Sequence, residues 1–207
     1  MRIVMLGTGY VGIVSGTCFA EMGNTVTCVD TNAEKIEKLN RGIVPIYEPG
    51  LDQMIKDNAS KNRLFFTSDS EKAIQGADVV FICVGTPPSK DGSADLSYVF
   101  ESARTIGRNV SDYTVVVTKS TVPVGTTFEV ERIVKQELSG RSTDAVVEMA
   151  NNPEFLKEGN AISDFMGPDR VVVGTSSERV RKIMRRIYAP FFRTDQRIIF
   201  MSIPSSE

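Results

Sequence analysis

The sequence of 207 residues contains no histidine and no tryptophan, and only three cysteines. Without histidine, the chain lacks the side chain that most often serves as a general base or a metal ligand near neutral pH. Cys18, Cys28 and Cys83 lie in apolar stretches and are too few for a disulfide framework or a metal cluster. We therefore expect no metal site, and acid–base chemistry has to come from carboxylates, lysine, hydroxyls or bound water.

An excess of charge of either sign is also missing, as is any long apolar run. The 24 Lys and Arg residues nearly balance the 26 Asp and Glu residues, which leaves a net charge of -2. That balance disfavours nucleic acid or a membrane surface as a partner. No run approaches the ~20 apolar residues of a transmembrane helix, and the N-terminus lacks the pattern of a signal peptide. Together with the few cysteines, this predicts a cytoplasmic protein.

A glycine-rich stretch near the N-terminus is the most informative pattern that is present. The apolar run Ile3–Leu6 predicts a buried parallel strand, which precedes a helix pattern of small residues that reaches Met22. Gly7, Gly9 and Gly12 lie between them in the spacing Gly-x-Gly-x-x-Gly. Gly7 permits a tight turn, Gly9 lets a pyrophosphate approach the backbone, and Gly12 lets the helix pack closely on the sheet. Free N–H groups at the helix N-terminus would bind the anion.

The end of the next predicted strand, Thr25–Val29, supports a dinucleotide site. Asp30 closes that strand, where a carboxylate can accept hydrogen bonds from the adenosine ribose and would repel a 2′-phosphate. The sequence therefore predicts NAD rather than NADP as the cofactor. Lys35, in the first turn of a helix that Asn32 is expected to cap, can reach the same ribose, although a solvated lysine is an equally good interpretation. A strand-turn-helix without a ligand is the alternative for the whole stretch.

Hydroxyl side chains follow two further predicted strands. The apolar run Val79–Val84 predicts a central strand covered on both faces, and Thr86 comes directly after it. Thr121 closes a hydroxyl cluster that follows the predicted strand Thr114–Val117. Because open α/β sheets bind ligands at the carboxyl ends of their strands, both threonines are candidates for the cofactor site. Turn residues without a ligand would give the same pattern.

Strands and helices alternate along the chain, without an internal repeat or an obvious linker. This order predicts an α/β fold with a doubly wound, mostly parallel sheet of the Rossmann type. We expect one NAD-binding domain over 1–207, made of a nucleotide-binding core over 1–122 and a βα extension over 123–207. The remaining predicted strands are 64–66, 145–149, 171–174 and 198–201, and the remaining helices are 33–40, 51–58, 69–75, 96–109, 125–138 and 178–188. The basic residues of the last helix are most simply a solvated face.

Six separated motifs together resemble the nucleotide-sugar 6-dehydrogenases, the UDP-glucose/GDP-mannose dehydrogenase family. They are Gly-x-Gly-Tyr-Val-Gly (7–12), Glu-Pro-Gly-Leu (48–51), Val-Gly-Thr-Pro (84–87), Lys-Ser-Thr-Val-Pro-Val-Gly-Thr (119–126), Asn-Pro-Glu-Phe-Leu-Lys-Glu-Gly (152–159) and Pro-Asp-Arg-Val-Val-Val-Gly (168–174). The resemblance covers essentially the whole chain. It implies an enzyme that uses two NAD to oxidise a sugar primary alcohol to a uronic acid, through an aldehyde and a cysteine thioester that water releases.

The resemblance also implies roles for individual residues. The NAD site would be formed by Gly7, Gly9, Tyr10, Val11, Gly12, Asp30, Lys35, Thr86, Thr121 and Glu158. The nucleotide-sugar site would be lined by Glu154, Phe155, Leu156, Lys157 and Glu158. Thr121 and Glu154 would act in catalysis by holding and activating water. From the residues alone, Glu154 and Glu158 are equally well explained as first-turn carboxylates that a helix dipole favours.

By the same resemblance, the nucleophilic cysteine, a catalytic lysine and the sugar-binding domain would lie beyond Glu207. The three cysteines that are present are interpreted as small buried hydrophobes, none of them at the carboxyl end of a strand. We therefore expect this chain to be the cofactor-binding portion of the enzyme and to be inactive on its own. We also expect the longer protein to be a homo-oligomer, and this chain to be a monomer or weak dimer.

Several functions stay open at the level of the sequence. UDP-glucose is the favoured substrate, and GDP-mannose or a UDP-N-acetyl sugar is the alternative within the family. A nucleotide-binding module without catalysis is the alternative outside it. The lack of a suitable cysteine favours the module, whereas the motif at 152–159 favours the enzyme.

Overall fold

The computed structural model describes residues 1–192 and 197–207. Within these residues the chain forms one eight-stranded sheet in the order β3-β2-β1-β4-β5-β6-β7-β8. The strands are β1 (Arg2–Leu6), β2 (Thr25–Val29), β3 (Leu64–Thr67), β4 (Val79–Ile82), β5 (Thr114–Thr118), β6 (Val147–Asn151), β7 (Val171–Gly174) and β8 (Ile198–Met201). Neighbouring strands are parallel except for β6 and β7, which pair antiparallel. The predicted α/β fold with a doubly wound, mostly parallel sheet is confirmed.

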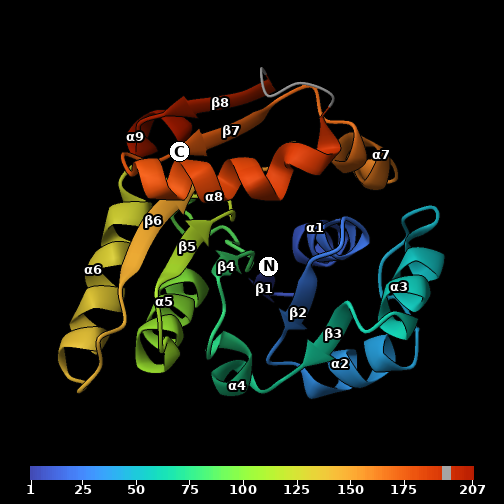
Figure 1. Cartoon of the computed structure of the whole chain (residues 1–207), viewed down its shortest axis with the longest axis horizontal. Helices are drawn as coiled ribbons and strands as arrows, with labels where there is room; N and C mark the ends of the chain where they lie inside the picture. The colour runs from blue at the N-terminus through green and yellow to red at the C-terminus, as the bar shows by residue number, and fades with distance from the viewer. Residues whose placement is uncertain (193–196) are drawn as a thin grey trace.

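Helices cover both faces of the sheet (Figure 1). One face carries α1 (Tyr10–Glu21), α2 (Ala33–Asn40), α3 (Leu51–Ser60), α7 (Ala161–Met166) and α8 (Glu178–Tyr188), which is followed by the 3-10 helix η1 (Ala189–Phe191). The other face carries α4 (Ser70–Ile74), α5 (Ser97–Asn109), α6 (Thr126–Ser139) and α9 (Ile203–Ser206). Successive side chains of β1 pack into opposite cores. Ile3 and Met5 pack into the first core, and Val4 and Leu6 pack into the second. Burial on both faces explains why the strands are continuously apolar.

The direction of winding changes between β1 and β4. After β1 the chain builds β2 and β3 on one side, and it then crosses to place β4 and the later strands on the other side. In open α/β sheets such a switch point leaves a crevice at the carboxyl ends of the strands, and ligands bind there. The turn at Gly7 and the segment that follows Ile82 both lie at this point.

Polar side chains begin several helices. The Asn32 side chain accepts a hydrogen bond from the Lys35 amide at 3.0 Å, so the cap predicted for α2 is confirmed. Ser177 caps α8 in the same way through the Val180 amide. Asp69, expected inside a helix, is instead the N-cap of α4 and accepts from the Lys72 amide.

Some boundaries differ from the prediction. β4 ends at Ile82 rather than Val84, and β6 spans Val147–Asn151 rather than 145–149. The Ala145 amide donates to the Thr143 hydroxyl instead of joining the ladder, which delays the start of β6. The short α7, η1 and α9 were not predicted, because a few turns carry too little apolar periodicity. The proposed division of the domain at residue 122 stays a prediction, since one continuous sheet spans it.

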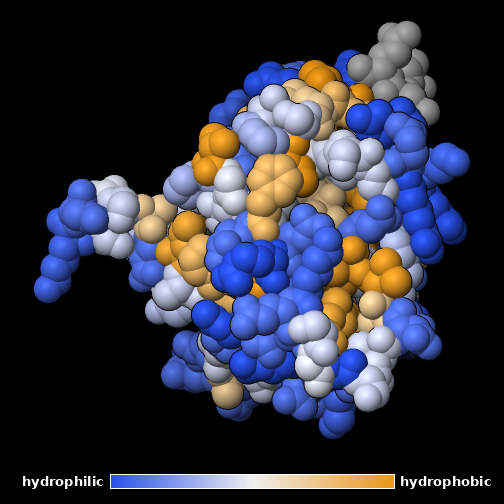
Figure 2. Space-filling model, turned by 90° about the vertical axis from the view of Figure 1, so that its left-hand side faces the viewer, coloured by the Kyte–Doolittle hydropathy of each residue, from blue (hydrophilic) through white to orange (hydrophobic). Residues whose placement is uncertain are grey.

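Among the described residues, none of the helices combines the length and the apolar composition needed to cross a membrane. Figure 2 faces the side of the molecule where α6 lies, and it shows a largely hydrophilic surface interrupted by separate apolar areas. Val124 and Phe128, at the start of α6, are among the exposed large apolar side chains.

Candidate functional site

The turn between β1 and α1 leaves backbone amides facing open space. Gly7 turns the chain with a φ of 102°, and a Cβ on Gly12 would lie 1.9 Å from the Gly7 carbonyl oxygen. A Cβ on Gly9 would meet no atom within 4 Å. No side chain caps the N-terminus of α1, so the amides of its first turn keep free donors. Gly7 and Gly12 therefore meet the conformational and packing demands that their spacing predicts, and the space above Gly9 suits an anionic group.

Asp30 lies beside this turn, with its carboxylate held in place by neighbouring donors. Its Oδ2 accepts from the Thr8 amide at 3.0 Å, the Thr8 hydroxyl at 2.6 Å and the Lys35 ammonium at 3.2 Å, while Oδ1 accepts from the Asn32 amide at 3.0 Å. Burial opposes ionisation, but these hydrogen bonds and the Lys35 charge outweigh it and hold the pKa of Asp30 below its usual value. Because a carboxylate has about four acceptor positions, Oδ1 retains capacity for a further donor such as a ribose hydroxyl.

Gly7, Gly9, Asp30 and Lys35 share one hollow of about 330 Å³, which we call the fingerprint groove. Its other wall comes from Cys83 to Gly85, after β4, and from α5. The groove is therefore built at the switch point between β1 and β4. Its volume lies in the range of pockets that hold small molecules. The residues predicted for the adenosine end of a dinucleotide thus lie together.

A second hollow of about 230 Å³, which we call the central hollow, continues from the groove. It is lined by Gly9, Tyr10, Val11, Cys83, Val84, Gly85, Thr86, Lys119, Ser120, Thr121 and Glu154. The Thr86 hydroxyl donates to the Thr121 carbonyl at 3.0 Å, and the Ser120 hydroxyl donates to the Val84 carbonyl at 2.6 Å. These bonds join the ends of β4 and β5. The two threonines predicted for the cofactor site therefore lie on one wall.

The position of Cys83 corrects one expectation. We expected it inside the central strand, away from any carboxyl end, but β4 ends at Ile82 and Cys83 is the next residue. Its side chain lines both the fingerprint groove and the central hollow while remaining only 7% exposed. Burial raises the pKa of the Cys83 thiol to about 12, and Lys119 opposes this only in part. The thiol is therefore protonated at neutral pH, and Cys18 and Cys28 are buried free thiols as expected.

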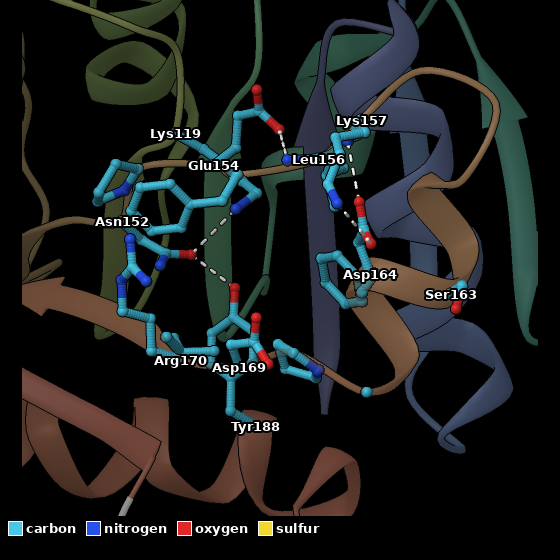
Figure 3. Close-up of a pocket in the computed structure, with 16 residues that line it drawn as sticks. Lys119, Asn152, Glu154, Leu156, Lys157, Ser163, Asp164, Asp169, Arg170 and Tyr188 are labelled. Atoms are coloured by element: carbon cyan, nitrogen blue, oxygen red, sulfur yellow. Dashed lines mark hydrogen bonds and ion pairs between the residues drawn. The ribbon is translucent and has the colours of Figure 1, made fainter.

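A third hollow, of about 240 Å³, lies under the segment that follows β6; we call it the loop hollow (Figure 3). At its base, the Asn152 amide oxygen accepts from the Lys119 ammonium at 3.3 Å and from the Tyr188 hydroxyl at 2.6 Å. The Asn152 amide nitrogen donates to the Val172 carbonyl at 2.7 Å, so the side chain is fixed on both sides. Lys119 is 3% exposed, and burial lowers the pKa of its ammonium group. A confined cation therefore lies between the loop hollow and the central hollow, since it lines both.

The rim of the loop hollow is formed by the segment predicted to bind substrate. Glu154, Phe155, Leu156 and Lys157 all line it, and Glu154 also lines the central hollow. The Glu154 carboxylate accepts from the Leu156 amide at 2.8 Å, and the Arg170 guanidinium lies 4.9 Å from the centre of the Phe155 ring. The predicted catalytic residues Thr121 and Glu154 share the central hollow. A hydroxyl, a carboxylate and a buried ammonium therefore converge where the hollows meet.

Three of the predicted residues lie differently from the others. Gly12 is buried and lines none of the three hollows. Glu158 is exposed and lines none of the three hollows described here; its charge lies near Tyr10. Tyr10 lines the central hollow, but its hydroxyl donates to the Glu48 carboxylate rather than pointing free into the space. Their assignment to the cofactor or substrate site stays a prediction.

Several residues of the site were missed by the sequence analysis. Thr8 and Tyr188 gave no signal of their own, because a threonine in a turn or a tyrosine on a helix is ordinary, and Asn152 entered only as part of the motif at 152–159. Lys119 carried a usable one, since a lysine directly after an apolar strand must be buried or turned aside. Glu48 bonds to residues 38 and 111 positions away, which no local pattern reveals. Among the described residues, no cluster of His, Cys, Asp or Glu side chains is arranged to hold a metal ion.

The geometry has counterparts in known proteins. The sequence profile for the NAD binding domain of the UDP-glucose/GDP-mannose dehydrogenase family matches residues 1–192. The chain is 49% identical to a UDP-glucose 6-dehydrogenase of Rhizobium meliloti, over all of this chain and 47% of that protein. It also resembles a solved GDP-mannose dehydrogenase from Pseudomonas aeruginosa (TM-score 0.91, 36% identity, 100% of this chain and 47% of that one). A UDP-glucose dehydrogenase from Pyrobaculum islandicum is similar (TM-score 0.89, 39% identity, 99% and 46%). The chain thus spans about half the length of the curated relatives it matches.

Proposed function

The chain belongs to the UDP-glucose/GDP-mannose dehydrogenase family as its NAD-binding domain, and we propose that it forms the cofactor side of the active site of a UDP-glucose 6-dehydrogenase. One observation carries the proposal. The fingerprint groove and the loop hollow each share lining residues with the central hollow, and those shared with the loop hollow are Glu154 and Lys119. A cofactor and a sugar bound in the two outer hollows would meet beside these side chains.

The chain's own residues fit NAD. The open space above Gly9 and the free amides of α1 would receive the pyrophosphate, and the spare acceptor capacity of Asp30 would bind the adenosine ribose. Lys35 already pairs with Asp30 and lies on the same wall. Thr86, Thr121 and Glu158 would complete the site toward the reacting end. When bound there, NAD supplies the hydride acceptor for oxidation of the sugar alcohol.

The segment that follows β6 would hold the nucleotide sugar. Glu154, Phe155, Leu156, Lys157 and Glu158 follow one another there, and the first four line the loop hollow. The Thr121 hydroxyl and the Glu154 carboxylate would hold a water molecule, and the carboxylate would take its proton. The buried Lys119 ammonium lines the same hollow. The completed two-step oxidation would belong to the longer protein.

The substrate is proposed from the pattern of relatives. The UDP-glucose enzymes are up to 49% identical to the chain, whereas the GDP-mannose enzyme is 36% identical. Formation of NADH by the full-length protein, followed by absorbance with either sugar, tests the choice. We expect two NADH per UDP-glucose, and a loss of about 100-fold or more in kcat for Thr121→Ala and Glu154→Gln. Faster turnover of GDP-mannose would contradict the substrate, and one NADH per sugar would contradict the double oxidation.

A further inference from the structure

Glu48 is a buried carboxylate for which the proposed function provides no role. It belongs to the motif Glu-Pro-Gly-Leu at 48–51, yet it lines none of the three hollows described above. Its neighbours Tyr47 and Pro49 are exposed, whereas Glu48 is 7% exposed. A carboxylate turned inward from a surface loop loses hydration that its new partners have to replace.

The partners of Glu48 come from two other parts of the chain. Its Oε2 accepts from the Tyr10 hydroxyl and from the Gly159 amide, the latter at 3.0 Å, and its Oε1 accepts from the Ile162 amide at 3.1 Å. The Gly159 amide is also 2.6 Å from the Tyr10 hydroxyl. Burial alone would raise the pKa of Glu48, but these donors together hold it below its usual value. One carboxylate therefore ties the start of α1 to the end of the 152–160 loop.

The 152–160 loop is held to the rest of the molecule at its two ends. At its start, Asn152 is fixed by Lys119, Tyr188 and the Val172 carbonyl. At its end, Gly159 is held by Glu48 and Tyr10. Between these points, the described hydrogen bonds of 153–158 stay within the loop and α7, as in Leu156 to Glu154 and Lys157 to Asp164. The Glu48 contacts therefore decide where the second half of the loop lies.

We propose that Glu48 is a positioning residue that holds the 152–160 loop against the Gly9–Tyr10 turn, so that a ligand in the fingerprint groove steadies the loop. Tyr10 is the link, because it is the first residue of α1 and follows Gly9 directly. A pyrophosphate bound to the α1 amides would restrain Tyr10. The Tyr10 hydroxyl would then restrain Gly159, to which it is hydrogen-bonded. The nucleotide-sugar role of the loop rests on the proposed function, whereas the mechanical link does not.

Amide hydrogen–deuterium exchange on the 207-residue chain, with and without NADH, tests the proposal. We expect Glu48→Gln and Tyr10→Phe each to speed exchange of the 154–162 segment by about tenfold or more, while β4 and α5 exchange as in the unchanged chain. The matched control is Tyr113→Phe, which removes the other tyrosine-to-glutamate hydrogen bond, to Glu148, without touching the loop. It should leave exchange of the loop unchanged. In the unchanged chain NADH should slow amide exchange of the loop. In Glu48→Gln and in Tyr10→Phe this effect of NADH should be lost.

Each outcome decides one claim. Unchanged loop exchange in both variants overturns the positioning role, even where NADH binds. Faster loop exchange in a chain that does not bind NADH supports the positioning role and overturns the cofactor proposal. If NADH still slows amide exchange of the loop in Tyr10→Phe, the link through Tyr10 is contradicted. If Glu48→Gln does not fold, Tyr10→Phe carries the test, since it removes one hydroxyl and leaves the Gly159-to-Glu48 bond in place.

Discussion

Lys119 is the most confined charge among the residues of the site. Its ammonium donates to Asn152 and lies 5.9 Å from the centre of the Phe165 ring, with burial lowering its pKa. A lysine with a lowered pKa in the folded state binds fewer protons than the unfolded chain does. Its cost to stability is therefore present at neutral pH and fades as the pH rises through the folded pKa toward about 10.4. A residue kept at such a cost suggests a role in function rather than in folding.

Replacing this lysine with an apolar residue of similar length should remove the cost of burying its charge. We expect Lys119→Met to raise the midpoint of thermal unfolding by about 3 °C, the shift that 1 kcal/mol produces in a domain of this size. Lys61→Met, at an exposed lysine, is the control and should shift the midpoint by less than about 1 °C. Calorimetry on the three proteins gives the answer. A lower midpoint for Lys119→Met would mean that the ammonium stabilises the fold.

At the scale of single residues, the sequence predicted which side chains belong to the site better than it predicted where each side chain lies. Asp30 was predicted from its place after a strand, and Lys35 was one of two equally good interpretations; the two do lie together in one groove. Cys83 was placed inside a strand because the apolar run continues to Val84, whereas β4 ends at Ile82. Periodicity cannot locate the last ladder bond of a buried run, since apolar residues also line hollows. Tyr10 was predicted from its motif, but the partner of its hydroxyl is 38 positions away.

At the scale of elements, two glycines between β1 and the first turns of α1 differ in what they contribute: one to ligand binding and the other to stability. Gly9 has a φ of -68°, which any residue adopts, and open space at its Cβ position, whereas a Cβ on Gly12 would lie 1.9 Å from the Gly7 oxygen. We expect Gly9→Val to unfold like the unchanged chain but to lose NADH affinity by about tenfold or more. Gly12→Val should lose stability by about 3 kcal/mol. Urea unfolding and NADH titration measure both, and equal stability losses would contradict the distinction.

The link between α1 and the 152–160 loop should depend on pH. The pKa of Glu48 is lowered in the folded state, so the carboxylate binds fewer protons there than in the unfolded chain, where its pKa is about 4.3. Its contribution is then complete above about pH 5 and is lost as the pH falls through the folded value. We expect Glu48→Gln to cost about 2 kcal/mol at pH 7 and progressively less below pH 4. Urea unfolding across this range measures it, and a cost that grows on acidification would contradict the prediction.

The elements that the sequence predicted are those with long apolar patterns or clear caps. α2 and α8 match their predicted bounds, and Asn32 was expected to cap the first of these two helices. α7 was missed since six residues span less than two turns, and Glu48, far away in the sequence, bonds to its first turn. The basic face of α8 is exposed at Arg179, Lys182, Arg185 and Arg186, as predicted, and two of its guanidinium groups also lie on aromatic rings. Arg179 stacks 3.3 Å from the centre of the Tyr113 ring, and Arg185 lies 4.7 Å from that of Phe200.

For the whole molecule, the exposed apolar side chains predict weak self-association. The exposed large apolar side chains are spread over several segments of the chain: Ile43, Tyr47, Phe65, Tyr98, Val124, Phe128, Val146, Phe155 and Ile199. A stable dimer buries about 1,200–2,000 Å² in a continuous patch, which scattered residues do not provide. We expect the 207-residue chain to sediment as a monomer at about 10 µM, a concentration well below the Kd of a weak dimer. A dimer that persists at nanomolar concentration would contradict this.

The doubly wound, mostly parallel sheet and the cofactor followed from the sequence because they depend on local patterns repeated along the chain. The junction of the three hollows did not, because it is made by side chains from the ends of β1, β4, β5 and β6. Even so, most residues predicted for the site do line these hollows. What the sequence could not supply was the buried chemistry between them, in Lys119, Asn152 and Tyr188.

Calorimetric titration of the 207-residue chain with NADH and with NADPH tests the central claim most directly. In the groove the Asp30 carboxylate is ionised and keeps an acceptor position free, so it should bind a ribose hydroxyl and repel a 2′-phosphate. We predict that NADH binds at least about tenfold more tightly than NADPH, a difference of about 1.4 kcal/mol, and that Asp30→Ala removes most of this preference. Equal affinity for the two dinucleotides, or a preference that survives in Asp30→Ala, would contradict the account.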